Sequence, residues 1–215
     1  MTMELPTLGE IEAFAMIVDI NGFTKMVSNA RGRAIAQFVR DTLVGGIEIT
    51  ERNSGYAVGL MGDAFLSIFT DPEDVIGTCY SIARDVDRRS EYISDSQQED
   101  PEVFPSPPGG VTIKITIEYG WMDISTVTTR LLGTQRLFIG PPINTASRLG
   151  ATGKGNRCIV GPEAIKRLPI DSGYVTRLAP VSGKDGEPEY ECYEVDLEEI
   201  WRSGLINPGE ETFWG

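Results

Sequence analysis

Apolar residues in the first half of this chain alternate between short runs that suit strands and a wider spacing that suits helices. Residues 13–19 form an apolar run that ends in an acid, which predicts a buried strand. From 33 to 52, apolar side chains recur with the period of an amphipathic helix. Residues 56–60 and 64–69 then predict two strands of a hairpin that turns through residues 61–63.

The second half predicts one more helix, a polar loop and further strands. Asp71-Pro72 has the composition of a helix start, and we expect this helix to reach about Ile93. Residues 94–110 are acidic and rich in proline, which predicts an exposed loop. Alternation from Val111 to Tyr119 predicts a strand with one buried face. Beyond it we expect strands near 126–132, 136–139, 158–160, 174–178 and 190–195, and helices over 143–149 and 162–168.

This order of elements predicts an α/β fold of the α+β kind, a sandwich whose mostly antiparallel central sheet is covered by helices. The 215 residues are enough for one substantial core. We therefore expect a single domain over residues 1–195, with the 94–110 loop as an insertion, and a C-terminal tail over residues 196–215.

Composition narrows the chemistry and the partners. Nineteen basic and 32 acidic residues give a net charge of −13, which argues against nucleic acid and anionic membranes as partners. The chain has no histidine, which excludes Ser-His-Asp triads and HExxH zinc sites. No apolar run approaches the roughly 20 residues that cross a bilayer, and the start of the sequence lacks signal-peptide features, so a cytoplasmic location is expected.

Two aspartates stand where predicted strands end. Asp19 precedes a turn through Gly22, Phe23 and Thr24, and Asp63 follows Gly62 at the tip of the predicted hairpin. If the strands pair, the two carboxylates lie together and suit Mg²⁺ or Mn²⁺, while the turn offers backbone N–H groups to a phosphate. Taken singly, Asp19 could instead cap a helix and Asp63 could fill a turn.

A third feature lies on the helix predicted over 143–149. Asn144 and Arg148 stand four residues apart and so share one helix face. An amide and a guanidinium in this arrangement could orient a ribose and stabilise charge on a reacting phosphate. As a lone pattern, an exposed asparagine and arginine on a helix are also commonplace.

Together these motifs resemble the class III adenylate and guanylate cyclases. The matching segments, in the order of that family, are Asp19-Ile20-Asn21-Gly22-Phe23-Thr24, Gly62-Asp63-Ala64-Phe65 and Gly140-Pro141-Pro142-Ile143-Asn144-Thr145-Ala146-Ser147-Arg148-Leu149. The resemblance implies a class III cyclase-like sandwich that uses two divalent metal ions, Mn²⁺ or Mg²⁺. It implies attack of the ribose 3′-hydroxyl on the α-phosphorus of a nucleoside triphosphate, with loss of pyrophosphate. It also implies a head-to-tail homodimer with two shared active sites.

The resemblance also suggests roles residue by residue. It makes Asp19 and Asp63 ligands of the metal ions, together with the carbonyl of Ile20. It implies that Asn144 positions the ribose and that Arg148 binds the α-phosphate in the transition state. It places the phosphates against the turn at Gly22, Phe23 and Thr24 and against two lysines, Lys114 and Lys184. Both lysines could instead be ordinary solvated charges.

Base selection departs from the purine enzymes of this family. Where those enzymes typically have a lysine and an aspartate that select adenine, this chain has Gly59 and Leu137, whose side chains cannot hydrogen-bond a purine. Tyr56 could offer its ring and hydroxyl to a smaller base, or could simply pack in the hairpin. The combination resembles the bacterial pyrimidine cyclases of the Pycsar anti-phage systems. That resemblance implies that cyclic UMP or cyclic CMP is made on phage infection and sensed by a separate effector. Of the two substrates we favour UTP, with cyclic UMP as product.

Three other interpretations stay open at this stage. The base could be cytosine, since nothing in the sequence separates it from uracil, and the product would then be cyclic CMP. An ordinary adenylate cyclase could read its base through backbone groups. A catalytically dead nucleotide-binding or dimerisation module is the interpretation that involves no reaction.

Overall fold

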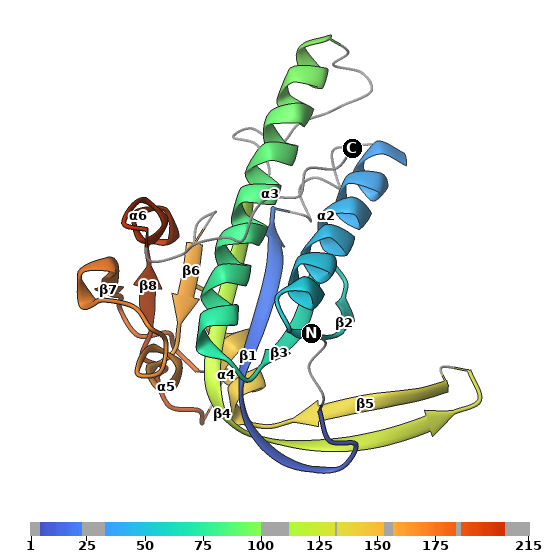
Figure 1. The fold of residues 1–215 in the computed structure, drawn as a ribbon, viewed down its shortest axis with the longest axis vertical. Coiled ribbons are helices and arrows are strands. Elements are labelled where there is room, and N and C mark those ends of the chain that lie inside the picture. The colour runs from blue at the N-terminus through green and yellow to red at the C-terminus, as the bar shows by residue number, and fades with distance from the viewer. Residues whose placement is uncertain are drawn as a thin grey trace.

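One mixed sheet organises the fold (Figure 1). The computed structural model describes residues 5–22, 33–99, 112–131, 133–152, 157–183 and 186–204. In chain order the elements are β1 (Gly9–Asn21), α2 (Arg33–Arg52), β2 (Tyr56–Met61), β3 (Ala64–Phe69), α3 (Pro72–Glu99), β4 (Thr112–Thr129), β5 (Gly133–Ile139), α4 (Pro141–Leu149), β6 (Arg157–Val160), α5 (Pro162–Ile165), the 3-10 helix η1 (Ser172–Tyr174), β7 (Val175–Arg177), β8 (Tyr193–Val195) and α6 (Leu197–Arg202).

Strand β1 lies in the middle of this sheet. The strand order is β2-β3-β1-β4-β6-β8-β7, and β5 pairs with the far part of β4. β1 is antiparallel to both of its neighbours, and among the described strand pairs only β4 and β6 run parallel. The predicted sandwich with a mostly antiparallel central sheet is therefore confirmed.

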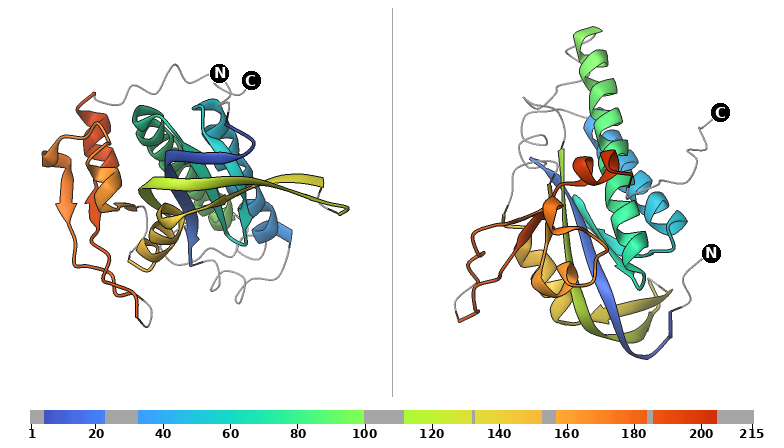
Figure 2. Two further views of the ribbon diagram at one scale, coloured as in Figure 1. Left: turned by 90° about the horizontal axis from the view of Figure 1, so that it is seen from below. Right: turned by 60° about the vertical axis from the view of Figure 1, so that its left-hand side comes forward.

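Helices cover both faces of the sheet, as Figure 2 shows. The first core cluster lies between the sheet and the helices α2 and α3, and β1 contributes to it the side chains of Phe14, Met16, Val18 and Ile20. The second lies on the opposite face under α4, and β1 contributes Ala13, Ala15 and Ile17. Because β1 is buried on both faces, its sequence is a continuous apolar run and does not alternate.

Several elements extend beyond their predicted ends, among them β1 and α3. Strand β1 begins at Gly9 and not at residue 13. Helix α3 continues to Glu99, so the prediction that 94–110 is a loop is wrong for its first six positions. Residues 94–99 contain neither glycine nor proline and end in the good helix formers Gln-Gln-Glu, whereas a proline follows at 101. The rest of the predicted loop lies outside the described residues.

Part of the predicted tail packs on the domain. Asp196 accepts a hydrogen bond from the backbone N–H of Glu199 at 2.9 Å and so caps α6. Ile200 is buried in the first core cluster, where α6 contacts α3. The side chain of Trp201 and all of Trp214 lie outside the described part. Within the described ranges, no helix combines the length and the apolar composition that crossing a membrane requires.

Strands β4 and β5 form a two-stranded arm that projects from the body of the molecule (Figure 1). Its pairing runs from Asp123 with Ile139 to Thr129 with Gly133. The arm exposes several large apolar side chains, namely Val127, Leu131, Leu137 and Ile139. Leu131 is 91% exposed at the tip. An apolar group of this kind on a projecting arm is typical of a surface that another protein chain covers.

A buried carboxylate ties the sheet to α5. Glu118 on β4 is only 5% exposed, and its Oε1 accepts hydrogen bonds from the backbone N–H groups of Tyr119 at 2.8 Å and Ala164 at 2.9 Å. Gly161 allows this approach, because a Cβ there would lie 2.1 Å from Glu118 Oε2. Burial raises the pKa of Glu118, and the backbone hydrogen bonds oppose that rise.

Replacement of Glu118 by glutamine should destabilise the fold by about 1–3 kcal/mol, because the carboxylate also accepts a backbone hydrogen bond from Glu163 that an amide nitrogen cannot accept. The measurement is urea unfolding, with Glu12→Gln as the control because Glu12 is exposed on β1. A folded pKa above the ordinary value of about 4.3 means that protonation favours the folded chain. The stability advantage of the native protein over Glu118→Gln should therefore shrink as the pH rises from about 4.3 through the raised pKa. Equal unfolding midpoints for Glu118→Gln and Glu12→Gln would contradict this account.

Candidate active site

The sheet places Asp19 and Asp63 at neighbouring strand ends. Asp19 pairs with Ala64, the residue that follows Asp63, in the antiparallel register of β1 and β3. The backbone N–H of Ile20 donates to the carbonyl oxygen of Asp63 at 3.1 Å. Gly62 adopts φ +71° in the turn before Asp63, a conformation that favours glycine. Local turn chemistry and strand pairing thus bring together two carboxylates that lie far apart in the sequence.

Lys114 lies on the other side of Asp19. The two residues are partners in the register of β1 and β4, and Lys114 Nζ lies 3.7 Å from Asp19 Oδ2. The Lys114 side chain is only 11% exposed. Burial raises the pKa of Asp19, Lys114 opposes that rise, and the nearby charge of Asp63 adds to it. The two carboxylates and the one ammonium together leave a net negative charge at this edge of the sheet.

This donor set fits a divalent cation that prefers oxygen ligands. Asp19, Asp63 and the carbonyl of Ile20 would supply oxygens from two rigid strands. No cluster of three or more histidine, cysteine or acidic side chains occurs within the described ranges. Carboxylate and carbonyl oxygens are the hard ligands of Mg²⁺ and Mn²⁺, whereas structural zinc sites use cysteine and histidine. A site with so few protein ligands would leave coordination positions for phosphate oxygens, as is typical of Mg²⁺ at nucleotide sites.

The turn after β1 is described only at its start. Gly22 has φ +75° and is exposed, and a Cβ there would meet no other atom within 4 Å. The backbone conformation at position 22 therefore explains why a glycine stands there, and crowding does not. Phe23, Thr24 and Lys184 lie outside the described residues, so their predicted phosphate contacts stay predictions.

Helix α4 holds Asn144 and Arg148 on the opposite face of the sheet from α2 and α3 (Figure 2). Asn144 is exposed, whereas Arg148 makes a bidentate pair with Glu187, with Nε and Nη2 donating at 2.9 and 2.8 Å. In the described part of the chain, Asp19 forms an ion pair with Lys114, and Arg148 forms one with Glu187. The structure does not join the two aspartates to Asn144 and Arg148 by any hydrogen bond among the described residues.

The three base-selecting candidates do not form one cluster. The Tyr56 ring lies 5.5 Å from the ring of Phe138, and the guanidinium of Arg136 lies over it at 5.4 Å. Leu137 alternates with Phe138 along β5 and so points to the other face, where it is 41% exposed. Gly59 is exposed in β2, and a Cβ there would meet no atom within 4 Å.

Two residues in these surroundings escaped the sequence interpretation. Arg136 could have been found from the alternation on β5, which puts it on the same face as Phe138. No short-range sequence pattern indicates that Glu187 pairs with Arg148, because the two residues lie 39 positions apart.

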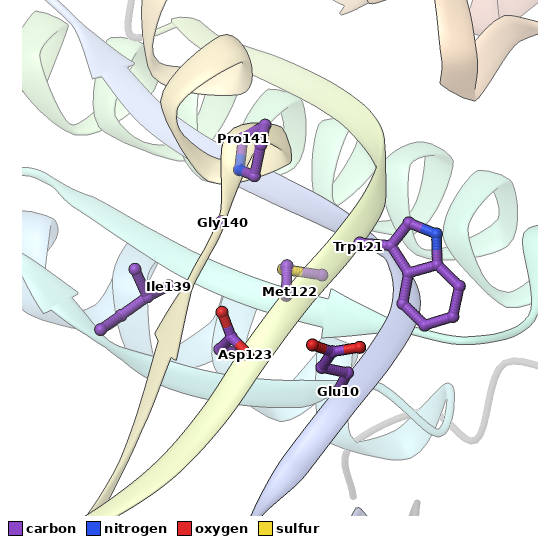
Figure 3. Close-up of a pocket in the computed structure, with 7 residues that line it drawn as sticks. All are labelled: Glu10, Trp121, Met122, Asp123, Ile139, Gly140 and Pro141. Atoms are coloured by element: carbon purple, nitrogen blue, oxygen red, sulfur yellow. The ribbon is translucent and has the colours of Figure 1, made fainter.

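A cavity of about 330 Å³ lies at the base of the arm (Figure 3). Its lining residues come from β1, β4, β5 and the start of α4, and they are Glu10, Trp121, Met122, Asp123, Ile139, Gly140 and Pro141. Glu10 and Asp19 stand nine residues apart on β1, a path of about 30 Å. The cavity is therefore separate from the carboxylate pair, and none of the predicted site residues lines it.

Comparison with known proteins identifies the family. Residues 10–196 match the model of the adenylate and guanylate cyclase catalytic domain. No curated protein sequence matches the chain.

Several solved structures share the fold. The adenylyl cyclase CyaB from P. aeruginosa is 16% identical, with 88% of this chain and 95% of that chain covered and a TM-score of 0.68. The guanylyl cyclase Cya2 is 12% identical, with 88% and 94% covered and a TM-score of 0.72. The guanylate cyclase domain of RhGC from Catenaria anguillulae, in complex with GTP, is 18% identical, with 87% and 98% covered and a TM-score of 0.66.

These identities are too low to transfer a substrate, so the structural likeness establishes the fold alone. The family match is different in kind, because it extends over most of the sequence, from β1 to the residue before α6. This chain belongs to the adenylate and guanylate cyclase catalytic domain family, the class III nucleotidyl cyclases.

Proposed function

We propose that this chain is a pyrimidine cyclase that converts UTP into 3′,5′-cyclic UMP and pyrophosphate. The observation that supports a pyrimidine is the loss of both purine-selecting side chains, at Gly59 and Leu137, together with a tyrosine on the strand of Gly59 whose ring contacts Phe138 and Arg136. The metal chemistry and the sharing of the active site between two copies are further parts of this proposal.

The base argument starts from what Gly59 and Leu137 cannot do. A pocket that reads a purine through polar contacts loses much of its selectivity when those groups are missing. Crowding does not require glycine at 59, because a side chain there would have open space. Tyr56 is the polar aromatic group on the same strand as Gly59, and its ring contacts Phe138 and Arg136. A fixed ring and hydroxyl suit a small, flat base.

The reaction chemistry follows from the two carboxylates and from α4. Asp19, Asp63 and the Ile20 carbonyl would hold two divalent cations, Mn²⁺ or Mg²⁺. When bound, such cations supply Lewis-acid stabilisation to the phosphates and lower the pKa of the ribose 3′-hydroxyl. Arg148 would stabilise the charge that develops on the α-phosphate, and Asn144 would orient the ribose.

A head-to-tail homodimer would complete the site. Arg148 pairs with Glu187, which precedes β8, and both β4 and β6 lie between β8 and β1 in the sheet. A second copy facing the sheet could bring its own Asn144 and Arg148 to these aspartates. The exposed apolar residues of the arm support a dimer, because a partner would remove them from water.

The biological part of the proposal rests on the resemblance to the Pycsar enzymes. Cyclic UMP would be the signal of a bacterial anti-phage defence system, and a separate effector would sense it. Since the product diffuses away from the enzyme, no contact between the cyclase and the effector is required.

Incubation of the native chain with Mn²⁺ and each of ATP, GTP, CTP and UTP should yield cyclic UMP from UTP, identified by mass.

The double variant Gly59→Lys with Leu137→Asp should gain turnover of ATP at the expense of UTP, because both side chains have room at exposed positions. Tyr56→Phe with native Gly59 and Leu137 should instead lower turnover of UTP, because it removes the hydroxyl proposed to bind the base. A purine product from the native chain would refute the pyrimidine assignment, and cyclic CMP alone would replace uracil by cytosine.

Asp63→Asn and Arg148→Ala should each lower turnover by at least about 100-fold, because each removes a group that stabilises the reacting phosphates. A 1:1 mixture of the two inactive variants should recover about a quarter of native activity, because half of randomly formed dimers contain one intact shared site. Asp41→Asn, on the surface of α2, should behave as the native chain and serves as the control. No recovery, once subunit exchange has been shown, would contradict a site shared between two copies.

A further inference from the structure

We infer that Glu187 is a positioning residue for the cyclisation reaction, which fixes the plane of the Arg148 guanidinium. The inference rests on the role proposed above for Arg148. It adds a residue from outside α4 to the reaction, and it explains why an exposed carboxylate stands beside a cation meant for phosphate.

The geometry of the pair supports orientation. Arg148 Nε donates to Glu187 Oε2 at 2.9 Å, and Nη2 donates to Oε1 at 2.8 Å. This contact uses one edge of the planar guanidinium and fixes both its plane and its rotation. Nη1 takes no part in the pair. A carboxylate bound to the two terminal nitrogens would instead compete directly with a phosphate for the end of the fork.

Glu187 is itself held in place. The Tyr190 hydroxyl donates to Glu187 Oε2 at 3.4 Å, and hydrogen bonding to Glu187 and then to Tyr190 raises the pKa of Arg148. Val181 and Tyr190 exchange backbone hydrogen bonds of 2.8 Å in both directions. Gly183 lies so close that a Cβ there would be 2.5 Å from Glu187 Cβ. Because Glu187 is itself fixed on this paired segment, it can fix the orientation of the Arg148 guanidinium.

The segment that carries Glu187 packs against the end of α4. Leu149, the residue after Arg148, is fully buried in the cluster formed with Ile159, Val181 and Cys192. The backbones on both sides of the ion pair are therefore anchored in one apolar cluster. The Arg148 and Glu187 side chains are 28% and 33% exposed, so a nucleotide can still reach the guanidinium.

A second ion pair on the same segment offers a matched comparison. Arg177 Nη2 donates to Glu191 Oε1 at 2.7 Å, but these side chains are 64% and 50% exposed. That pair is a single contact near solvent and is remote from α4. Glu187→Gln and Glu191→Gln therefore remove the same charge from the same segment, and only the first removes a partner of Arg148.

The test is steady-state cyclase kinetics of Glu187→Gln and Glu191→Gln, each in the native and in the Arg148→Lys background. Glu187→Gln should lower kcat about 10- to 100-fold and change KM by less than about 2-fold, because orientation matters most in the transition state. Glu191→Gln should leave both constants unchanged. In the Arg148→Lys background, which lacks the planar fork, Glu187→Gln should cause little further loss.

Three results would overturn the inference. The first is a native kcat for Glu187→Gln. The second is a raised kcat for Glu187→Gln, which would show that Glu187 withholds Arg148 from the phosphate. The third is a loss of kcat on Glu187→Gln in the Arg148→Lys background that equals the loss in the native background. Thermal unfolding midpoints of the two glutamine variants must agree, and an unfolded Glu187→Gln would make the role structural. The proposed function fails separately, through an inactive native chain or a fully active Arg148→Ala.

Discussion

Strand β1 is paired along both edges, with β3 on one side and β4 on the other, and the candidate site depends on that double pairing. The register sets Asp19 directly opposite Lys114 and next to the residue that follows Asp63. Because side chains alternate between the two faces of a strand, a shift of one residue would turn Asp19 toward α2 and α3. Burial of both faces of β1 makes such a shift costly, since it would expose or overpack two core clusters at once.

Those parts of the structure that local chemistry determines could be predicted from the sequence. The hairpin with Asp63 at its tip follows from apolar runs on either side of Met61-Gly62-Asp63, and the bounds of α2 follow from its periodicity. The full length of β4 could not be predicted, because beyond Ile124 the strand forms the exposed arm and lacks a buried face. The Arg148–Glu187 pair joins elements that no sequence periodicity links. Family position links Gly59 with Leu137, and the strand links Gly59 with Tyr56, yet alternation on β5 turns Leu137 away from the face of Phe138, which contacts Tyr56.

Charge compensation gives the candidate site its present form. The chain has a net charge of −13, and two cations assigned to phosphate, Lys114 and Arg148, each lie beside a carboxylate. On the proposed function, divalent cations at Asp19 and Asp63 would replace the ammonium of Lys114 and free it for a phosphate. Arg148 differs, because its contact with Glu187 uses only one edge of the fork. The Lys114–Asp19 pair would thus break on substrate binding, whereas the Arg148–Glu187 pair would persist.

The most direct test of a site shared between two copies is a crystal structure with Mn²⁺ and 3′-deoxy-UTP, which cannot cyclise. The account predicts anomalous peaks for two metal ions within about 2.5 Å of the Asp19 and Asp63 carboxylates. It also predicts that the α-phosphate of the same nucleotide lies against Arg148 of the partner subunit. Metal bound away from these aspartates, or a nucleotide held within one chain, would contradict the account.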